Sequence, residues 1–110
     1  MNIGVIGLGL IGGSLALAAR KHLSNIRLYG EDQKSAHLDE ALKLGIVDET
    51  LNSENYAAMD VIILAIPVDA SVTKVIPLLD QMNDNALLLD VGSTNCSSLC
   101  ICHIYWHKIF

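Results

Sequence analysis

The stretch from Asn2 to His22 reads NIGVIGLGLIGGSLALAARKH. Its first residues, Asn2–Ile6, form a short apolar run that predicts a β-strand. The six residues GLGLIG follow and fit the pattern G-x-G-x-x-G, and apolar residues at helical spacing then predict a helix from Leu10 to His22. A strand, a glycine-rich turn and a helix in this order are typical of a dinucleotide-binding fold, because the turn lets a pyrophosphate approach the start of the helix.

Each glycine of this turn has a mechanical role in such a fold. Gly7 permits the tight turn, Gly9 lets the backbone approach the pyrophosphate, and Gly12 allows the helix to pack closely on the strand. A turn with only a structural role is the alternative. We expect the cofactor to be bound here by Gly7, Leu8, Gly9, Leu10, Ile11 and Gly12.

A carboxylate follows the second predicted strand, Ile26–Gly30. Asp32 lies twenty residues after Gly12, where this fold expects an acid that binds the adenosine ribose 2′-hydroxyl. The neighbouring Glu31 is a rival, but a short side chain just past a strand end turns more readily into the crevice. A carboxylate here repels a 2′-phosphate, so we expect NAD rather than NADP, although Lys34 would soften that exclusion. The alternative is that both acids are ordinary solvated loop residues.

The rest of the chain alternates helices and strands. The further predicted elements are a helix over Ser35–Leu44, a short strand at Ile46–Val47, a strand over Val61–Ile66, a helix over Ala70–Leu79 and a strand over Ala86–Val91. This order predicts an α/β fold, a Rossmann-type, doubly wound and mainly parallel sheet that is incomplete at its C-terminal end. We expect one nucleotide-binding domain over residues 1–95 and an atypical tail over residues 96–110.

Ligands of open α/β sheets bind beyond the carboxyl ends of the strands. Ala65, Ile66 and Pro67 end one predicted strand, and we expect them to line the cofactor site, with Pro67 stiffening a loop over the nicotinamide ribose. Ser93 and Thr94 follow the last predicted strand and offer hydroxyls near the nicotinamide ring. The alternative is that they form a turn that caps the next helix.

Composition excludes several classes of function. The formal net charge of −5 argues against a nucleic-acid partner, which requires a basic face. No apolar run reaches the roughly 20 residues of a membrane span. No basic segment precedes the first apolar run, as it would in a secretory signal. We therefore expect a cytoplasmic protein that acts on a small molecule.

Five segments of the chain together resemble the prephenate dehydrogenase family. They are MNIGVIGLGLIGG (Met1–Gly13), LYGED (Leu28–Asp32), ALKLGIVDE (Ala41–Glu49), DVIILAIPV (Asp60–Val68) and LDVGST (Leu89–Thr94). The resemblance implies an oxidative decarboxylation of prephenate to 4-hydroxyphenylpyruvate with NAD+, in tyrosine biosynthesis. It also implies that Ser93 is a catalytic residue on the substrate side, near the substrate hydroxyl, and that the family protein is a homodimer.

The tail departs from that family. Asn95 stands where the family has a lysine, and His103 and His107 lack the proline and glycine of the family's His-Pro-x-(A/G)-Gly motif. The helical dimerisation domain of the family is also absent from this sequence. We therefore expect a shifted reading frame or a truncation near Asn95, and a fragment that binds NAD without turnover. Arogenate as substrate, or a β-hydroxyacid or imine-type reductase, remains the alternative.

The same tail concentrates soft metal ligands. Cys96, Cys100, Cys102, His103 and His107 are enough for one tetrahedral zinc. Two of them are adjacent, however, and the spacing matches none of the usual paired-ligand loops. We expect incidental thiols and no metal site.

Overall fold

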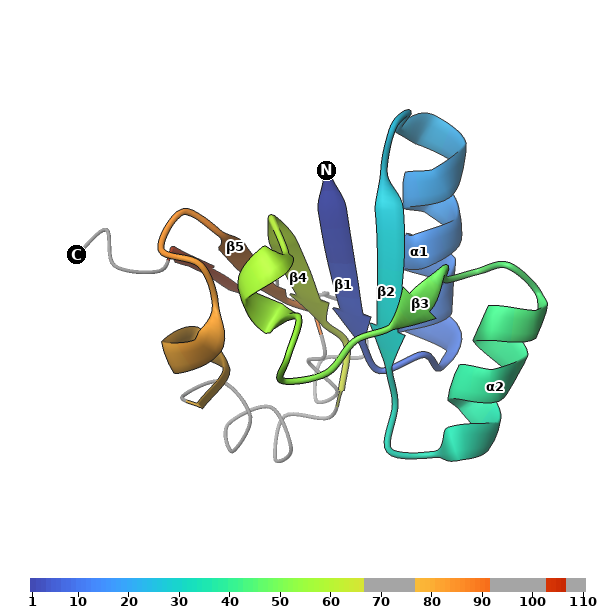
Figure 1. The fold of residues 1–110 in the computed structure, drawn as a ribbon. Helices are drawn as coiled ribbons and strands as arrows, with labels where there is room; N and C mark the ends of the chain where they lie inside the picture. The colour runs from blue at the N-terminus through green and yellow to red at the C-terminus, as the bar shows by residue number, and fades with distance from the viewer. Residues whose placement is uncertain (67–76, 92–102, 107–110) are drawn as a thin grey trace.

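The computed structural model describes residues 1–66, 77–91 and 103–106 (Figure 1). They build a six-stranded sheet in the order β3-β2-β1-β4-β5-β6. The strands are β1 (Asn2–Ile6), β2 (Arg27–Glu31), β3 (Glu49–Thr50), β4 (Val61–Leu64), β5 (Leu87–Asp90) and β6 (His103–Trp106). The helices are α1 (Leu10–His22), α2 (Ser35–Lys43) and the short 3-10 helix η1 (Tyr56–Ala58), and residues 77–81 are also helical.

The strand order reverses at the centre of the sheet. The chain runs outward from β1 through β2 to β3, and then crosses to β4 on the other side of β1. The first five strands are parallel, and Ile6 is paired with both Glu31 and Leu64. The carboxyl ends of β1, β2 and β4 therefore meet at one edge, at the switch point where such sheets bind ligands. The predicted fold class is confirmed.

Both faces of the sheet are buried, which explains the continuous apolar runs of β1 and β4. Figure 1 shows α1 and α2 side by side on one face. The buried residues on that face include Val5, Ala16, Leu28, Ala41 and Ile63. The opposite face is packed by Tyr56, Ile62, Leu64, Leu78 and Leu88.

The element bounds agree with the sequence patterns most closely at the start of the chain. β1 and α1 have their predicted bounds. β2 begins and ends one residue later than predicted, and α2 ends one residue earlier. β4 ends two residues early, and β5 is one residue shorter at each end. Most of the helix predicted at Ala70–Leu79 lies outside the described residues, although its last residues are helical and the helix continues to residue 81.

The structure differs from the predicted strands in two places. Ile46–Val47 is not a strand, because the N–H groups of both residues donate to the carbonyl of Ala41 and complete the end of α2. The third strand lies instead at Glu49–Thr50, beside β2. β6 lies in the tail, where the sequence analysis predicts no strand. It pairs antiparallel with β5 and covers the outer edge of that strand.

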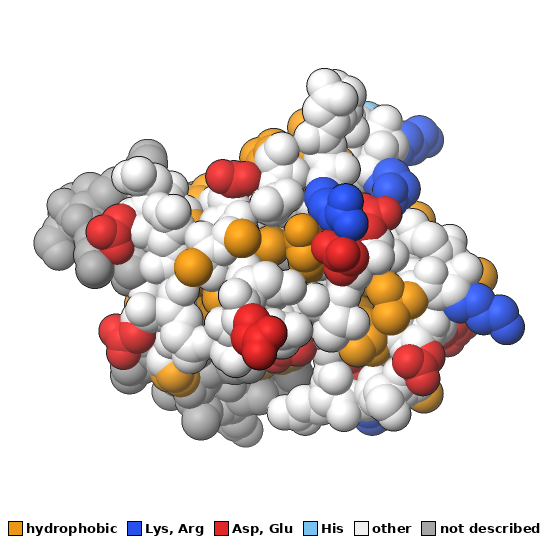
Figure 2. Space-filling view, in the orientation of Figure 1, with side chains coloured by type: hydrophobic (Ala, Val, Ile, Leu, Met, Phe, Trp, Pro, Cys, Tyr) orange, Lys and Arg blue, Asp and Glu red, His pale blue; other side chains and the backbone are white. Residues whose placement is uncertain are grey.

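The surface carries its charges unevenly. The lysines and arginines of the described residues all lie between Arg20 and Lys43. Figure 2 accordingly shows the basic side chains gathered on the side of α1 and α2, whereas acidic side chains are spread over the whole face. Among the described residues, none of the helices has the length and apolar character needed to cross a lipid bilayer.

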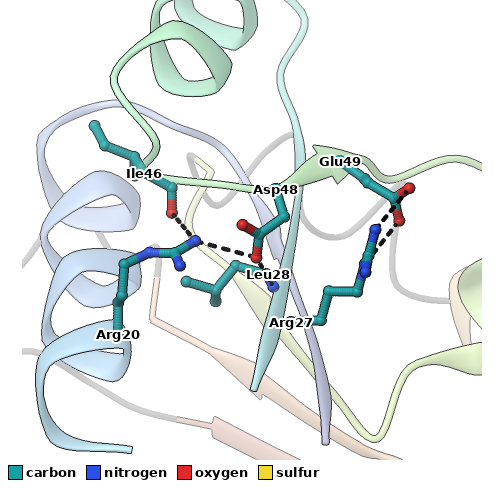
Figure 3. Close-up of polar contacts among 6 residues, drawn as sticks. All are labelled: Arg20, Arg27, Leu28, Ile46, Asp48 and Glu49. Atoms are coloured by element: carbon teal, nitrogen blue, oxygen red, sulfur yellow. Dashed lines mark hydrogen bonds and ion pairs between the residues drawn. The ribbon is translucent and has the colours of Figure 1, made fainter. Parts of the chain in front are cut away.

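Polar contacts hold the segment after α2 against its neighbours (Figure 3). Asp48 accepts a hydrogen bond of 3.0 Å from the backbone N–H of Leu28 and forms an ion pair of 3.1 Å with Arg20 of α1. A second, more exposed ion pair of 3.1 Å joins Arg27 to Glu49. Asp48 thus links α1, β2 and the approach to β3 through one carboxylate.

Candidate functional site

At two of the three glycines in the Gly-rich turn, the packing of the fold leaves no room for a side chain. Gly7 has φ +95°, and a Cβ there would lie 2.9 Å from the carbonyl carbon of Ala65 and from a methyl group of Ile66. A Cβ on Gly12 would collide with the carbonyl oxygen of Gly7 and lie 3.3 Å from Cβ of Ala65. These two positions accept only glycine because the turn, α1 and the end of β4 pack on one another.

Gly9 has no such reason to be glycine. Its φ is −73°, which any residue adopts, and a Cβ there would meet no atom within 4 Å. The space beside Gly9 is therefore open. An uncrowded glycine at the start of a helix is what close backbone approach by a ligand requires.

The start of α1 favours an anion. Gly9 is its N-cap residue, and no described side chain caps the helix by a hydrogen bond. The first N–H groups of an α-helix have no partner within the helix and carry the positive end of its dipole. The first turn contains no acidic residue, while Arg20, Lys21 and His22 occupy the last turn. A diphosphate at this end would find donors and no repelling carboxylate within the turn.

Asp32 lies directly against the Gly-rich turn. Its Oδ2 accepts a hydrogen bond of 2.7 Å from the backbone N–H of Leu8 and lies 3.3 Å from Nδ1 of His37. Its Oδ1 accepts a hydrogen bond of 2.8 Å from the backbone N–H of Lys34. Only 10% of its side chain is exposed. The carboxylate is therefore held in one orientation against Leu8 of the Gly-rich turn.

These contacts also set the protonation state of Asp32. Burial raises the pKa of its carboxyl. The N–H groups of Lys34 and Leu8 and the imidazole of His37 together lower the pKa by more than burial raises it, so the net pKa lies below the usual value. Asp32 is accordingly ionised at neutral pH, as an acceptor for hydroxyl donors needs to be.

The structure separates Asp32 from its rival Glu31. Successive residues of a strand point to opposite faces. A Cβ on Gly30 would touch Leu8 at 2.9 Å, so Gly30 and Asp32 face the Gly-rich turn. Glu31 faces the other side, where the hydroxyl of the buried Tyr56 donates to its carboxylate. The geometry thus favours Asp32 as the acid that a ligand on the turn would meet.

An open groove continues from the turn between α1 and α2. Its volume is about 270 Å³, and its apolar lining includes Leu10, Leu17 and Leu44. His37 and Glu40 of α2 supply polar groups. Sequence reasoning missed both. The signal for His37 is its place in the first turn of α2, one helical turn before Ala41, which lines the same groove.

The other predicted site residues are only partly described. Ala65 and Ile66 lie next to Gly7, and the N–H of Ala65 donates to the carbonyl of Ile6 at 2.7 Å, which extends the β4 pairing to the switch point. Pro67 and Ser93 lie outside the described residues, as does Thr94.

The possible zinc ligands of the tail are almost entirely outside the described part of the chain. Cys96, Cys100, Cys102 and His107 fall there, and only the backbone of His103 is described, in β6. Within the described residues, no group of three His, Cys, Asp or Glu side chains is positioned to bind a metal ion. The absence of a metal site in the tail stays a prediction.

Comparison with known proteins gives consistent results. Residues 15–99 match the family described as "Prephenate dehydrogenase, nucleotide-binding domain". A prephenate dehydrogenase of Bacillus subtilis (strain 168) is 37% identical over 91 residues, which are 80% of this chain and 24% of that protein. The chain thus spans about a quarter of the length of that relative.

Solved structures lead to the same family. Synechocystis arogenate dehydrogenase superposes with a TM-score of 0.74 at 29% identity, covering 83% of this chain and 32% of that one. A prephenate dehydrogenase from A. aeolicus, in complex with hydroxyphenyl propionate and NAD+, superposes with a TM-score of 0.75 at 26% identity, covering 83% of this chain and 33% of that one.

Proposed function

Because this chain belongs to the prephenate dehydrogenase family, as its nucleotide-binding domain, we propose that it holds NAD for the oxidation of prephenate. In that reaction NAD+ takes hydride from the ring carbon that bears the hydroxyl, the ring carboxylate leaves as CO2, and the ring becomes aromatic. The activity belongs to the whole family protein, a cytoplasmic homodimer in this proposal, of which the chain spans about a quarter.

Gly9 carries the proposal. It is the one glycine of the G-x-G-x-x-G turn that neither φ nor packing requires, and the open space beside it lies at the start of α1. There the pyrophosphate of NAD would accept hydrogen bonds from the first N–H groups of the helix. The remaining residues of the turn, Leu8, Leu10 and Ile11 among them, would line its path.

Asp32 would bind the adenosine ribose. The carboxylate is ionised and oriented against Leu8 of the turn, so it offers an acceptor to the 2′-hydroxyl. The same charge repels a 2′-phosphate, which supports NAD over NADP. That A. aeolicus prephenate dehydrogenase has been solved with NAD+ also supports this choice of cofactor.

The nicotinamide end of NAD would lie at the switch point. Ala65 and Ile66 follow β4 there, beside Gly7, and Pro67 continues the same segment. Ser93 follows β5 in the sequence and would meet the substrate hydroxyl. Arogenate is the second candidate substrate, because the arogenate dehydrogenase of Synechocystis is similar over the same part of the chain.

The experiment that tests cofactor binding compares glycine, alanine and valine at position 9. In isothermal titration calorimetry with NAD, Gly9→Val should weaken binding by more than about tenfold, because a branched side chain would occupy the place of the pyrophosphate. Gly9→Ala should have a smaller effect. Neither variant should change the melting temperature appreciably, since a Cβ at this position meets no atom within 4 Å.

The melting temperature is the internal control of this series. A folded Gly9→Val chain that binds NAD as tightly as the parent would contradict the assignment of the turn.

A further inference from the structure

Among the described residues, His37 is the one whose titratable side chain contacts Asp32. Its Nδ1 lies 3.3 Å from Oδ2 of Asp32. Lys34 and Leu8 also contact the carboxylate, but through backbone N–H groups whose charge does not change. Histidine is the side chain that ordinarily changes charge between pH 5 and 8.

The acceptor positions of Asp32 are nearly all used. A carboxylate offers about four, two on each oxygen. On Oδ2, one accepts from the N–H of Leu8 and the other faces Nδ1 of His37. On Oδ1, one accepts from the N–H of Lys34. After these contacts with the described residues, about one position remains on Oδ1, enough for one hydroxyl of a ribose.

His37 is placed to complete the recognition of that ribose. Its side chain is 42% exposed and lines the groove that also includes Gly9. A neutral ring that donates through Nδ1 keeps Nε2 as an acceptor, which suits a hydroxyl donor. A protonated ring donates from both nitrogens and carries a positive charge, which suits a phosphate.

We propose that His37 makes the choice between NAD and NADP depend on pH. The proposal rests on the proposed function, in which Asp32 binds the adenosine ribose. With His37 neutral, Asp32 keeps its full negative charge and the site takes a 2′-hydroxyl. With His37 protonated, the imidazolium offsets that charge and donates a hydrogen bond to a 2′-phosphate, so NADP binds better relative to NAD.

Within the part of the chain that the structure describes, few other charges lie around His37. Asp32 and Lys34 lie on the connection from β2 to α2, and Glu40 lies one turn further along α2 and lines the same groove. The groove-lining residues of α1 and of the segment after α2 carry no ionisable side chain: Leu10, Gly13, Ser14, Leu17, Leu44 and Ile46. Glu40 is therefore the one other acidic residue among the described lining of this groove.

The test measures the dissociation constants of NAD and NADP for the 110-residue chain by calorimetry at pH 6 and pH 8. For the parent, the ratio of the NADP constant to the NAD constant should fall about fivefold from pH 8 to pH 6. In His37→Gln this ratio should fall clearly less, because the 2′-phosphate of NADP still changes its charge with pH but residue 37 does not. His37→Lys, with a fixed positive charge, should keep a low ratio at both pH values.

His22→Gln is the matched control. It removes an exposed histidine from the last turn of α1, and it should behave as the parent does. If the parent and His37→Gln show the same change of ratio while both bind NAD, the role of His37 is wrong and the proposed function stands. If the parent binds neither nucleotide at either pH, both proposals are overturned.

Discussion

Asp32 serves two purposes with one carboxylate. It ties the N–H of Leu8 to the end of β2, and in the proposed function it presents an acceptor to the ribose. Oδ2 accepts from Leu8, whereas the described residues donate only one hydrogen bond to Oδ1, from the N–H of Lys34. The two tasks therefore fall to different oxygens. A change at this residue therefore affects folding and cofactor choice together, and the two effects need separate measurements.

Asp32→Ala should reduce NAD affinity and narrow the gap between NAD and NADP, because a 2′-phosphate would no longer meet a carboxylate. It should also lower the free energy of unfolding by about 1–3 kcal/mol, because the part-buried N–H of Leu8 loses its acceptor. Titration calorimetry measures the first effect and urea denaturation the second.

Asp39→Ala is the control for that substitution. It removes an equal charge from an exposed position of α2 and should leave both the cofactor ratio and the stability close to the parent's. An unchanged ratio of NAD to NADP affinity in a folded Asp32→Ala chain would mean that Asp32 does not read the ribose.

At the scale of elements, α1, β2 and the segment before β3 are joined by Asp48. The N–H of Leu28 lowers the pKa of the Asp48 carboxyl, burial opposes this effect, and Arg20 lowers the pKa further. The net pKa in the folded chain lies below the usual value. A carboxyl of this kind stabilises the fold above its unfolded pKa, and the contribution is lost as the pH falls through the folded pKa.

Asp48→Asn should therefore lower the free energy of unfolding at pH 7 by about 1 kcal/mol. The figure is small because both side chains of the Arg20–Asp48 pair are more than a third exposed, at 37% and 36%. The difference between parent and variant should shrink as the pH is lowered below about 4. Urea denaturation across pH 3–7 checks this, and Asp39→Asn should show no comparable pH-dependent difference. A difference that stayed constant over that range would contradict the role of the ionised carboxylate.

At the scale of the whole molecule, the 110-residue chain should bind NAD, although weakly, and oxidise no prephenate. Removing the hydroxyl proton of the substrate needs a positioned base, and Ser93 alone is a poor one. Substrate carboxylates need cationic partners such as a bidentate arginine, and the sequence contains no arginine after Arg27.

The formation of NADH in the presence of prephenate, followed by absorbance, measures this directly. The purified chain should give the same background rate as its Ser93→Ala variant. A rate above that of the variant would show that Ser93 acts in turnover within this chain, and the histidines of the tail would then need to be tested as bases.

β6 lies at the edge of the sheet, beside β5. A sheet that ended at β5 would leave the hydrogen-bonding groups of that strand open to pairing with other chains. The antiparallel pairing of His103–Trp106 covers that edge. Residues 103–106, which lie beyond the match to the family at residues 15–99, thus join the same sheet. The division of the chain at residue 95 stays a prediction.

The amino-acid sequence by itself determined the strand, Gly-rich turn and helix at the start of the chain, because glycine geometry and helical spacing are local properties. It also determined the succession of β1, α1, β2, α2 and β4 and the location of an acid after β2. The roles of Pro67 and Ser93 stay predictions, since neither is among the described residues.

Only the tertiary structure decided which acid faces the turn and what accompanies it. Whether residue 31 or 32 points toward Gly9 depends on where β2 ends and on the partner that Tyr56 provides from η1. The approach of His37 to Asp32 depends on how α2 leaves the sheet. The pairing of β6 with β5 likewise joins segments whose separate patterns do not specify each other. These features arise from contacts between residues distant in the chain or at the ends of elements, where local preference leaves more than one arrangement open and packing selects among them.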